Sequence, residues 1–297
     1  MKIWTPATSA NLGPGFDAMG MALSMGNQVE IEASERSRMQ GQPVYITRIE
    51  DHLIYKAMVR AWKEMGRKPR PVSLTQQDAI PGSRGLGSSA ACIAAGIAAA
   101  NALEGGLLSR RDCVELSAMM EGHPDNVLPA WEGGVCVGVM EEKRVDWVRL
   151  DPPQGLYAAA LIPDHPLSTA KARAVLPPSV SRADGVFNAG RAALLAAALA
   201  TGKLELLERA CQDRLHQIYR AGLIPDYGEV IQRVKALGAA AAFLSGAGPT
   251  IMSLWLAPPP PEAALDTALA GLAWQWKAKS LSVVDHGVRV EDAWQPG

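Results

Sequence analysis

The sequence has few of the features that mark several large classes of protein. It holds only four cysteines, Cys92, Cys113, Cys136 and Cys211, and no two of them form a C-x-x-C pair. Neither a zinc site nor a disulfide framework is therefore predicted. No apolar run reaches the roughly 18 residues of a membrane span, and the first residues lack the apolar stretch of a secretory signal. We expect a cytoplasmic protein that does not bind membranes.

Clustered positive charge is also missing. The formal net charge is -1, and Lys and Arg form no dense run. Proteins that hold nucleic-acid backbones without reading sequence rely on such clusters, so nucleic acid is not an expected partner. The string G-x-x-x-x-G-K-[ST] occurs nowhere in the chain, which excludes the P-loop class of nucleotide-binding proteins.

The composition is that of a globular protein. Of the 297 residues, 48% are hydrophobic and 20% are charged, while only 5% are aromatic. Because alanine and glycine are abundant, we expect a core in which small side chains allow close contacts between elements. The length favours two domains, which we place at residues 1–153 and 154–297, with the boundary at a Pro-Pro pair.

Strand and helix patterns alternate irregularly along the chain, which favours an α+β fold. We predict strands at 3–5, 28–33, 44–49, 72–75, 134–140, 146–150, 157–162, 242–245, 250–255 and 274–284. We predict helices at 52–65, 88–103, 168–175, 185–201, 203–216, 227–237 and 262–272, and one that is N-capped by Ser109 and continues to Glu121.

A Gly-rich loop at residues 82–89 runs directly into the helix at 88–103. Backbone N–H groups converge in such a loop, and the positive end of the helix favours negative charge, so the segment suits phosphate. Two other interpretations exist. A dinucleotide fingerprint of the type G-x-G-x-x-A fits Gly85 to Ala90, but its surroundings do not match that fold. An ordinary turn remains possible from this segment alone.

Three motifs in the chain together resemble those of one family. They are T-S-A-N-L-G-P-G-F-D at residues 8–17, P-x-x-x-G-L-G-S-S-A-A at 81–91 and S-G-A-G-P-T at 245–250. In this order they are similar to the motifs of the GHMP kinases, a family named for galactokinase, homoserine kinase, mevalonate kinase and phosphomevalonate kinase. The resemblance implies a two-domain fold, with an N-terminal domain like domain 2 of ribosomal protein S5 and a ferredoxin-like C-terminal domain. It also implies a site in the cleft between them, and a homodimer is common in the family.

Within that family, residues 8–13 and 122–127 resemble the homoserine kinase branch. The resemblance implies transfer of phosphate from ATP, with Mg²⁺, to the side-chain hydroxyl of L-homoserine, which gives O-phospho-L-homoserine for threonine biosynthesis. One alternative is another small-alcohol kinase of the family, of the threonine or mevalonate type. A second alternative is a catalytically silent protein of the same fold that only binds ligands.

The resemblance also implies which residues meet the nucleotide and its metal. Ser89 and Glu121 are the expected Mg²⁺ ligands, with Ser88 as the alternative hydroxyl, because Mg²⁺ prefers oxygen ligands. Glu121 would otherwise be an acid at the C-terminal end of a helix, where the helix dipole disfavours it. The expected ATP-binding residues are Pro81, Gly82, Ser83, Arg84, Gly85, Leu86, Gly87, Ser88, Ser89, Ala90, Ala91, Gly246 and Gly248.

Homoserine brings an α-carboxylate, an α-ammonium and a hydroxyl group. The segments at 169–177 and 219–225 resemble those that bind the carboxylate in homoserine kinases, which assigns that role to Arg173 and Arg220. Asn11 and Asp17 match positions that contact the hydroxyl and ammonium groups. Without the resemblance, each Arg would be an exposed helix residue, and Asn11 with Asp17 would form an Asx turn.

Asp17, His123, Asp125 and Asn126 are the expected catalytic residues. Asn126 stands where the mevalonate branch has an acid, and an amide cannot act as a base. We therefore expect a mechanism that orients the hydroxyl and stabilises the transferring phosphoryl group. The proton acceptor is left open among Asp17, phosphate and solvent. The loop from Glu121 to Asp125 is shorter than in some homoserine kinases, which bears on the metal geometry.

Overall fold

The computed structural model describes residues 1–41 and 48–291. In this part of the chain the first half forms a sheet of seven strands, in the order β11-β1-β2-β4-β3, with β5 also paired to β2 and β6 paired to β5. The pairs are antiparallel except for β3 and β4. The strands are β1 (Lys2–Ala10), β2 (Met19–Ala33), β3 (Arg38–Gly41), β4 (Val72–Gln77), β5 (Val135–Glu141), β6 (Arg144–Leu150) and β11 (Arg289–Glu291).

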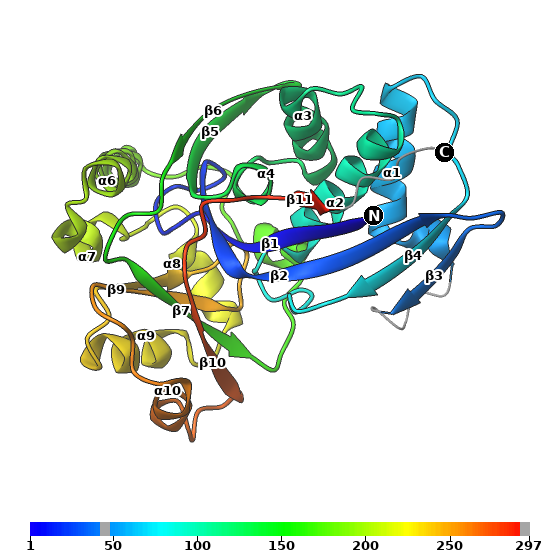
Figure 1. The fold of residues 1–297 in the computed structure, drawn as a ribbon. Helices are drawn as coiled ribbons and strands as arrows, with labels where there is room; N and C mark the ends of the chain where they lie inside the picture. Colours follow the sequence, from blue (N-terminus) through cyan, green and yellow to red (C-terminus); the bar gives the residue numbers. More distant parts are fainter. Residues whose placement is uncertain (42–47, 292–297) are drawn as a thin grey trace.

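Four helices pack with this sheet: α1 (Leu53–Glu64), α2 (Ser88–Leu103), α3 (Arg110–Glu121) and α4 (Val127–Glu132), as Figure 1 shows. A single 3-10 turn at Ile49–Asp51 precedes α1. Helix α2 lies between the other helices and the sheet and is almost wholly buried. Its contact with α1 is very close, because a Cβ at Gly96 would lie 2.2 Å from the carbonyl oxygen of Ile54. The predicted core of small side chains is thus found at the α1–α2 contact.

The second half forms a four-stranded antiparallel sheet in the order β10-β7-β9-β8. Its strands are β7 (Tyr157–Pro163), β8 (Ala241–Leu244), β9 (Ile251–Trp255) and β10 (Trp276–Leu281). The helices are α5 (Thr169–Ala174), α6 (Arg182–Thr201), α7 (Leu207–Ala210), α8 (Gln217–Arg220), α9 (Tyr227–Ala236) and α10 (Glu262–Ala268), with 3-10 turns at Leu204–Leu206 and Ala221–Leu223. Helical connections follow β7 and β9, which is the ferredoxin-like arrangement.

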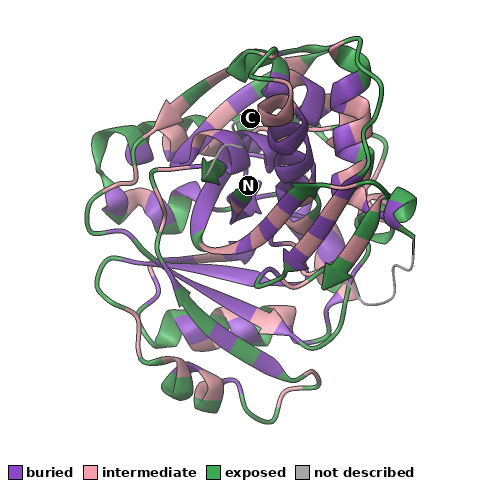
Figure 2. Cartoon of the chain, turned by 45° about the vertical axis from the view of Figure 1, so that its right-hand side comes forward, coloured by how far each residue is buried: buried purple, intermediate pink, exposed green. Residues whose placement is uncertain are grey.

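The two sheets confirm the predicted α+β class. Figure 2 shows buried and exposed residues alternating along several strands, as expected where one face of a sheet packs on a core. The predicted division at residue 153 falls between β6 and β7. Strand β11, however, pairs with β1, with Ile3 opposite Val290, so the end of the described chain belongs to the first sheet. The domain limits themselves stay a prediction.

One predicted helix was wrong. The segment 203–216 forms a 3-10 turn and the short helix α7, which ends at Ala210. Beyond it, the Asp213 carboxylate accepts hydrogen bonds from the backbone N–H groups of Leu215, His216 and Gln217. A side chain that competes in this way for backbone donors ends one helix and starts another. The sequence pattern shows the apolar spacing but not this competition.

Other differences are smaller. Strands β1 and β2 are longer than predicted, because the chain stays extended and buried through Ala10 and from Met19. Of the strand predicted at 44–49, residues 44–47 lie outside the described residues, and Ile49 begins a 3-10 turn. Strand β10 is shorter than the predicted 274–284. The elements β3, β11, α4 and α8 were missed; each has at most six residues, too few for a periodic signal. In the described part, none of the helices combines the length and apolar character of a bilayer span.

Candidate active site

The three motifs, which are far apart in the sequence, meet at one hydroxyl group. Ser245 Oγ lies 2.6 Å from the carbonyl oxygen of Gly85 and 2.8 Å from Ser9 Oγ. Backbone bonds reinforce the junction, since Gly246 N donates to Ala10 O at 3.1 Å and Thr8 N donates to Leu86 O at 3.1 Å. The turn after β8 therefore holds the end of β1 and the Gly-rich loop together.

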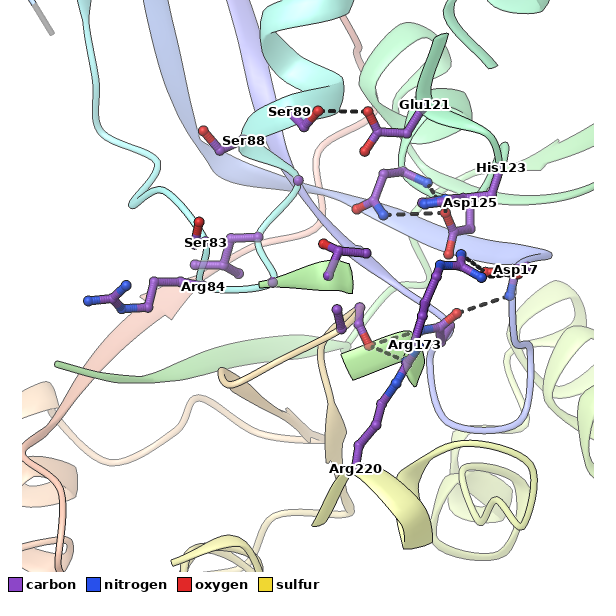
Figure 3. A pocket seen from close by; sticks show the side chains of 18 of the residues that line it. Asp17, Ser83, Arg84, Ser88, Ser89, Glu121, His123, Asp125, Arg173 and Arg220 are labelled. Atoms are coloured by element: carbon purple, nitrogen blue, oxygen red, sulfur yellow. Dashed lines mark hydrogen bonds and ion pairs between the residues drawn. The ribbon is translucent and has the colours of Figure 1, made fainter. Parts of the chain in front are cut away.

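A cavity of about 150 Å³ opens at this junction (Figure 3). Its lining includes every residue predicted to bind substrate or metal or to act in catalysis, together with most of the Gly-rich loop and Gly246. Four of the predicted nucleotide-binding residues do not line it. Ala90 and Ala91 are buried inside α2, Gly248 packs on Leu244, and Gly82 lines a second cavity. Thr169 and Ala247 line the first cavity but were missed, because neither residue type signals chemistry by itself.

The Gly-rich loop leads into the N-terminus of α2 beside the cavity. Its last residue, Gly87, is the N-cap of α2 and offers no side chain to cap the helix. The first N–H groups of α2 thus remain free of a side-chain partner, which is the arrangement that binds phosphate. Gly87 has φ +69°, and a Cβ there would lie 1.8 Å from Thr8 Oγ1. Gly85 has φ +76°, and its Cβ would lie 2.2 Å from the carbonyl oxygen of Ser245.

A second cavity of about 860 Å³ adjoins the loop on its other side. It shares Pro81, Ser83, Ser88 and Ser89 with the first cavity and extends past His52, Gln76, Asp78, Cys92 and Pro166. The volume is in the range of small-molecule and cofactor sites. Burial and the charge of Asp78 raise the pKa of Cys92 to about 12, so its thiol stays protonated. These wall residues come from several elements and carry no motif, so the sequence did not reveal the cavity.

Ser89 and Glu121, the predicted metal ligands, are direct neighbours. Ser89 Oγ donates to Glu121 Oε2 at 2.7 Å, across the gap between the start of α2 and the end of α3 (Figure 3). The hydroxyl is exposed and both side chains line the first cavity. One carboxylate and one hydroxyl oxygen are thus placed beside the N–H groups of the phosphate-binding loop.

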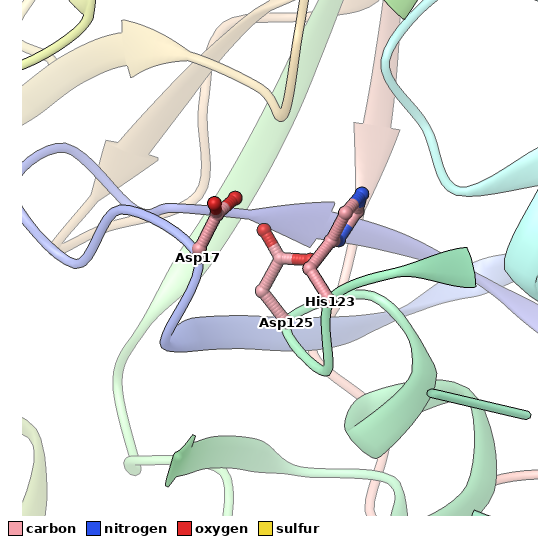
Figure 4. A group of neighbouring side chains, drawn as sticks. All are labelled: Asp17, His123 and Asp125. Atoms are coloured by element: carbon pink, nitrogen blue, oxygen red, sulfur yellow. The ribbon is translucent and has the colours of Figure 1, made fainter. Parts of the chain in front are cut away.

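Asp17, His123 and Asp125 form a compact group, in which one ligand-type atom from each lies within 4.8 Å of the others (Figure 4). His123 Nδ1 is hydrogen-bonded to Asp125 Oδ1, which also accepts from the backbone N–H of Asn126. Burial lowers the pKa of His123, but the hydrogen bond and charge of Asp125, with smaller effects from Glu121 and Asp17, leave it raised above its ordinary value. The ring therefore binds a proton more readily than a free imidazole does.

Asn126 and Asn11 are held by contacts inside the protein. Asn126 Oδ1 accepts from Thr8 Oγ1 at 2.7 Å. Asn11 Oδ1 accepts from the backbone N–H of Asp17 at 3.0 Å, and Asn11 Nδ2 donates to Gly246 O at 2.9 Å. Both Asn11 and Asp17 adopt positive φ, a backbone conformation that is concentrated at functional sites. Asn11 thus closes a loop of six residues to Asp17, wider than the Asx turn expected without the family resemblance, and joins it to the third motif.

Arg173 and Asp17 form a bidentate ion pair over the first cavity. Arg173 Nη2 lies 2.7 Å from Asp17 Oδ1, and Nη1 lies 3.1 Å from Oδ2. Both side chains are about one-third exposed, at 38% and 34%. The hydrogen bonds and charge of Asp17 raise the pKa of Arg173, although burial opposes this.

Without the family resemblance, Arg220 would be expected to be an exposed helix residue. It is buried instead, with only 1% of it exposed. Its Nε donates to Ala172 O at 3.0 Å and its Nη1 to Gly246 O at 3.1 Å. Burial, together with the charge of Arg173, lowers its pKa to about 10, so the group stays charged at neutral pH. The sequence suggested the residue but not its burial.

Two residues that support Arg220 were missed. His216, fully buried, places Nε2 2.8 Å from Gly13 O and Nδ1 3.2 Å from Arg220 Nη1. Since the carbonyl accepts and the guanidinium donates, the imidazole must be neutral with its proton on Nε2. The Phe16 ring stacks on His216 and lies 5.2 Å from the Arg220 guanidinium and 5.7 Å from that of Arg173. The spacing of His216 and Arg220 on one helical turn was the signal that could have found the first of them.

The chain matches known proteins over most of its length. Residues 52–134 match the GHMP kinases N terminal domain and residues 195–270 match the GHMP kinases C terminal domain. A homoserine kinase of Caldicellulosiruptor saccharolyticus is 47% identical over 257 residues, which cover 86% of this chain and 83% of that protein.

Solved structures agree with the sequence matches. A homoserine kinase from Cytophaga hutchinsonii superposes with a TM-score of 0.87 at 26% identity, covering 97% of this chain and 96% of that one. A putative homoserine kinase from Listeria monocytogenes gives a TM-score of 0.79 at 31% identity, covering 97% and 98%. Fold, motifs and relatives define a small-molecule kinase, and the chain belongs to the GHMP kinase family.

Proposed function

We propose that the protein transfers the γ-phosphoryl group of ATP to the side-chain hydroxyl of L-homoserine and releases ADP and O-phospho-L-homoserine. GHMP kinases use ATP as the phosphoryl donor, and the relatives of this chain are homoserine kinases. The observation that supports an amino-acid substrate is the pairing of Asp17 with Arg173 at the cavity, with Arg220 beneath them. One carboxylate and two guanidinium groups match the ammonium and carboxylate of an amino acid.

The two cavities support an arrangement for ATP. The larger one has room for the nucleoside, and it meets the smaller one at Ser88 and Ser89, where α2 begins. In our proposal the phosphates cross this junction and bind the N–H groups of the Gly-rich loop, so that the γ-phosphoryl group enters the smaller cavity. Gly85 and Gly87 tolerate no side chain because the loop packs closely against Ser245 and Thr8 at this junction.

The residues beside the loop fit a magnesium ion. Mg²⁺ is bound by oxygen ligands and often by one or two carboxylates together with substrate phosphates, and Glu121 with Ser89 offers this donor set. The ion would neutralise charge on the transferring phosphoryl group and help to orient it. Glu121, at the C-terminal end of α3, would gain a cation at a position where the helix dipole favours one.

The protein residues have three tasks in this mechanism. Arg173, Arg220 and Asp17 hold the amino-acid end, so that the hydroxyl points toward the loop. His123, whose pKa Asp125 raises, can add positive charge where the phosphoryl group is transferred. Asn126, fixed by Thr8, offers an amide that can orient the hydroxyl but cannot take its proton. Positioning and electrostatic stabilisation of this kind supply most of the rate enhancement in phosphoryl transfer.

The proposal is tested by ADP release from purified protein with Mg-ATP and a panel of homoserine, threonine, serine, mevalonate and galactose. We expect turnover with homoserine well above that with the other four. Turnover with a different alcohol would keep the kinase and replace the substrate. If none of the five compounds led to ADP release while the protein still bound ATP, a binding protein without catalytic activity would be favoured. Size-exclusion chromatography with light scattering tests the expected homodimer, and cell fractionation tests the expected cytoplasmic location.

A further inference from the structure

Arg84 belongs to the phosphate-binding loop, but its side chain is directed elsewhere. Figure 3 shows it extending away from the group formed by Asp17, Arg173 and Glu121. Its Nε donates to Pro163 O at 2.9 Å, its Nη2 to Asp164 O at 2.6 Å and its Nη1 to Gly82 O at 3.2 Å. Three of the five N–H groups of the guanidinium are thus engaged by backbone carbonyls.

Two of the three carbonyls that Arg84 contacts, those of Pro163 and Asp164, belong to the segment that leads into α5. Pro163 is the last residue of β7, and Ser168 is the N-cap of α5. A second bond joins the same two segments, since Leu167 N donates to Ser83 O at 3.0 Å. The loop therefore holds the 163–168 segment at both of its ends.

Helix α5 is short and carries the residues that would meet the amino acid. It spans six residues, among them Arg173, and Ala172 supplies the carbonyl that receives Arg220 Nε. Its own side-chain cap comes from Ser168, which accepts from Lys171 N at 3.2 Å. A helix of this length has little stability of its own, so its position depends on what holds its ends. At the N-terminal end, Ser83 and Arg84 hold the segment on the loop side, and Gln275 and Trp274 contact Asp164 and His165 on the other.

We infer that Arg84 is a positioning residue for the amino-acid substrate and not a phosphate ligand. It fixes the 163–168 segment, which sets the start of α5 and hence the guanidinium of Arg173 opposite Asp17. The inference rests on the proposed function, because it assigns one residue to the homoserine end of that site. It corrects the sequence-based expectation that every residue of the loop serves ATP.

This role requires a planar guanidinium, whose N–H groups point in fixed directions. Two neighbouring carbonyls, those of Pro163 and Asp164, each receive one N–H from the same planar group. A lysine ammonium on its flexible stem can reach one of them but cannot fix both in a set orientation. Arg84→Lys should therefore retain part of the effect, and Arg84→Ala should lose it.

The test compares four proteins: wild type, Arg84→Ala, Arg84→Lys and Arg233→Ala. Arg233 is a matched control because it also donates to two backbone carbonyls, those of Ala268 and Ala270, at 2.8 and 3.0 Å, away from the site. For each protein we would measure the KM values for homoserine and ATP, the thermal midpoint, and the calorimetric Kd of homoserine without nucleotide.

We expect Arg84→Ala to raise the homoserine KM and Kd by about 10- to 100-fold, since a misplacement near 1 Å costs that much, while the ATP KM changes less than about threefold. Arg84→Lys should be intermediate, and Arg233→Ala should change the thermal midpoint only. A rise in the ATP KM with an unchanged homoserine Kd would overturn the inference and make Arg84 a phosphate ligand; equal rises in both would overturn it as well. Wild-type protein that does not turn over homoserine would instead contradict the proposed function.

Discussion

Asp17 and Arg173, from opposite halves of the chain, neutralise each other in a bidentate pair at the mouth of the cavity, with N–O distances of 2.7 and 3.1 Å. An amino acid also carries one positive and one negative group, its ammonium and its carboxylate, and each can pair with the group of opposite charge on the protein. In our proposal the substrate ammonium binds Asp17 and the substrate carboxylate binds Arg173. Two ion pairs with the substrate then replace the one ion pair between Asp17 and Arg173. Because both groups are one-third exposed, separating them costs less than it would in the core.

Replacing Arg173 tests this exchange. We expect Arg173→Ala to raise the KM for homoserine about 10- to 100-fold, because hydrogen bonds to charged groups contribute about 1.5–3 kcal/mol. The KM for ATP should stay within about twofold, since the lost contact is specific to the amino acid. Steady-state kinetics with each substrate varied in turn gives both values. Equal damage to the two KM values would remove Arg173 from the carboxylate site.

Glu121 should set the metal requirement. We expect Glu121→Gln to lower kcat at least about 100-fold at ordinary Mg²⁺ concentration, because it removes the one charged metal ligand in the proposed pair and with it the fixed position of the phosphoryl group. Part of the loss should return at high Mg²⁺. The measurement is turnover across a magnesium titration, with EDTA as the zero point. Asp112→Asn, in the capping box of the same helix, is the control and should alter stability without altering the magnesium curve.

Two glycines of the loop form a matched pair of tests. A side chain at Gly87 would clash with Thr8 and must adopt φ +69°, whereas a side chain at Gly82 meets nothing within 4 Å. We expect Gly87→Ala to lower activity by more than about 100-fold and to destabilise the protein by about 1–3 kcal/mol, the range for a strained backbone position. Gly82→Ala should change stability and kcat little; because Gly82 lines the larger cavity, any effect should appear in the KM for ATP. Thermal unfolding and ADP release measured on both variants decide this, and similar behaviour of the two would contradict the predicted geometry.

His216 should make the protein less stable in weak acid. Its burial lowers its pKa below the value of about 6.5 in an unfolded chain, against the opposing charge of Asp213. The unfolded state therefore binds the proton more readily, so this contribution to stability is present above pH 6.5 and decreases as the pH falls below it. Protonation of the native ring, which occurs only below its lowered pKa, would place a second cation against Arg220, so the homoserine KM should rise at a lower pH than that at which stability begins to fall.

The measurement is the free energy of unfolding in urea between pH 5 and 8, for wild type and His216→Gln. A glutamine amide can donate to Gly13 and accept from Arg220 as the neutral ring does, but it does not titrate. The difference between the two proteins should therefore depend on pH below about 6.5 and be constant above it. Parallel curves over the whole range would show that His216 does not carry the effect.

The motifs predicted the fold and the content of the first cavity because they consist of residues with a direct task at a turn or a ligand. The long, strongly patterned elements, such as α2 and α6, were also found. What escaped prediction depends on contacts between distant segments. His216 and Phe16 act through their packing on Arg220, and the larger cavity is made by unrelated residues of α1, β4 and α2.

For Arg84, the sequence predicted a site residue but assigned it the wrong contact. Its motif assigned it to the nucleotide with the rest of the loop, yet its hydrogen bonds lead to β7 and the start of α5. The motif identifies which residues occur together but not where each side chain points. Similarly, the roles of Asn11 and Asn126 depend on the bonds to Gly246 and Thr8, across more than a hundred residues of sequence.

Strand β11 has a consequence for how the protein is made. Arg289, Val290 and Glu291 pair with Trp4, Ile3 and Lys2, so this edge of the first sheet stays open until residues 289–291 have been synthesised. Strand β1 ends at Ala10, one residue before Asn11. On the ribosome the N-terminal half therefore waits, with an unpaired edge at residues 2–4, the end of β1 away from Asn11, while the second half is translated. Kinase activity should appear only once residues 289–291 have left the ribosome, and ribosome-bound chains that end before residue 289 should bind neighbouring chains through that edge.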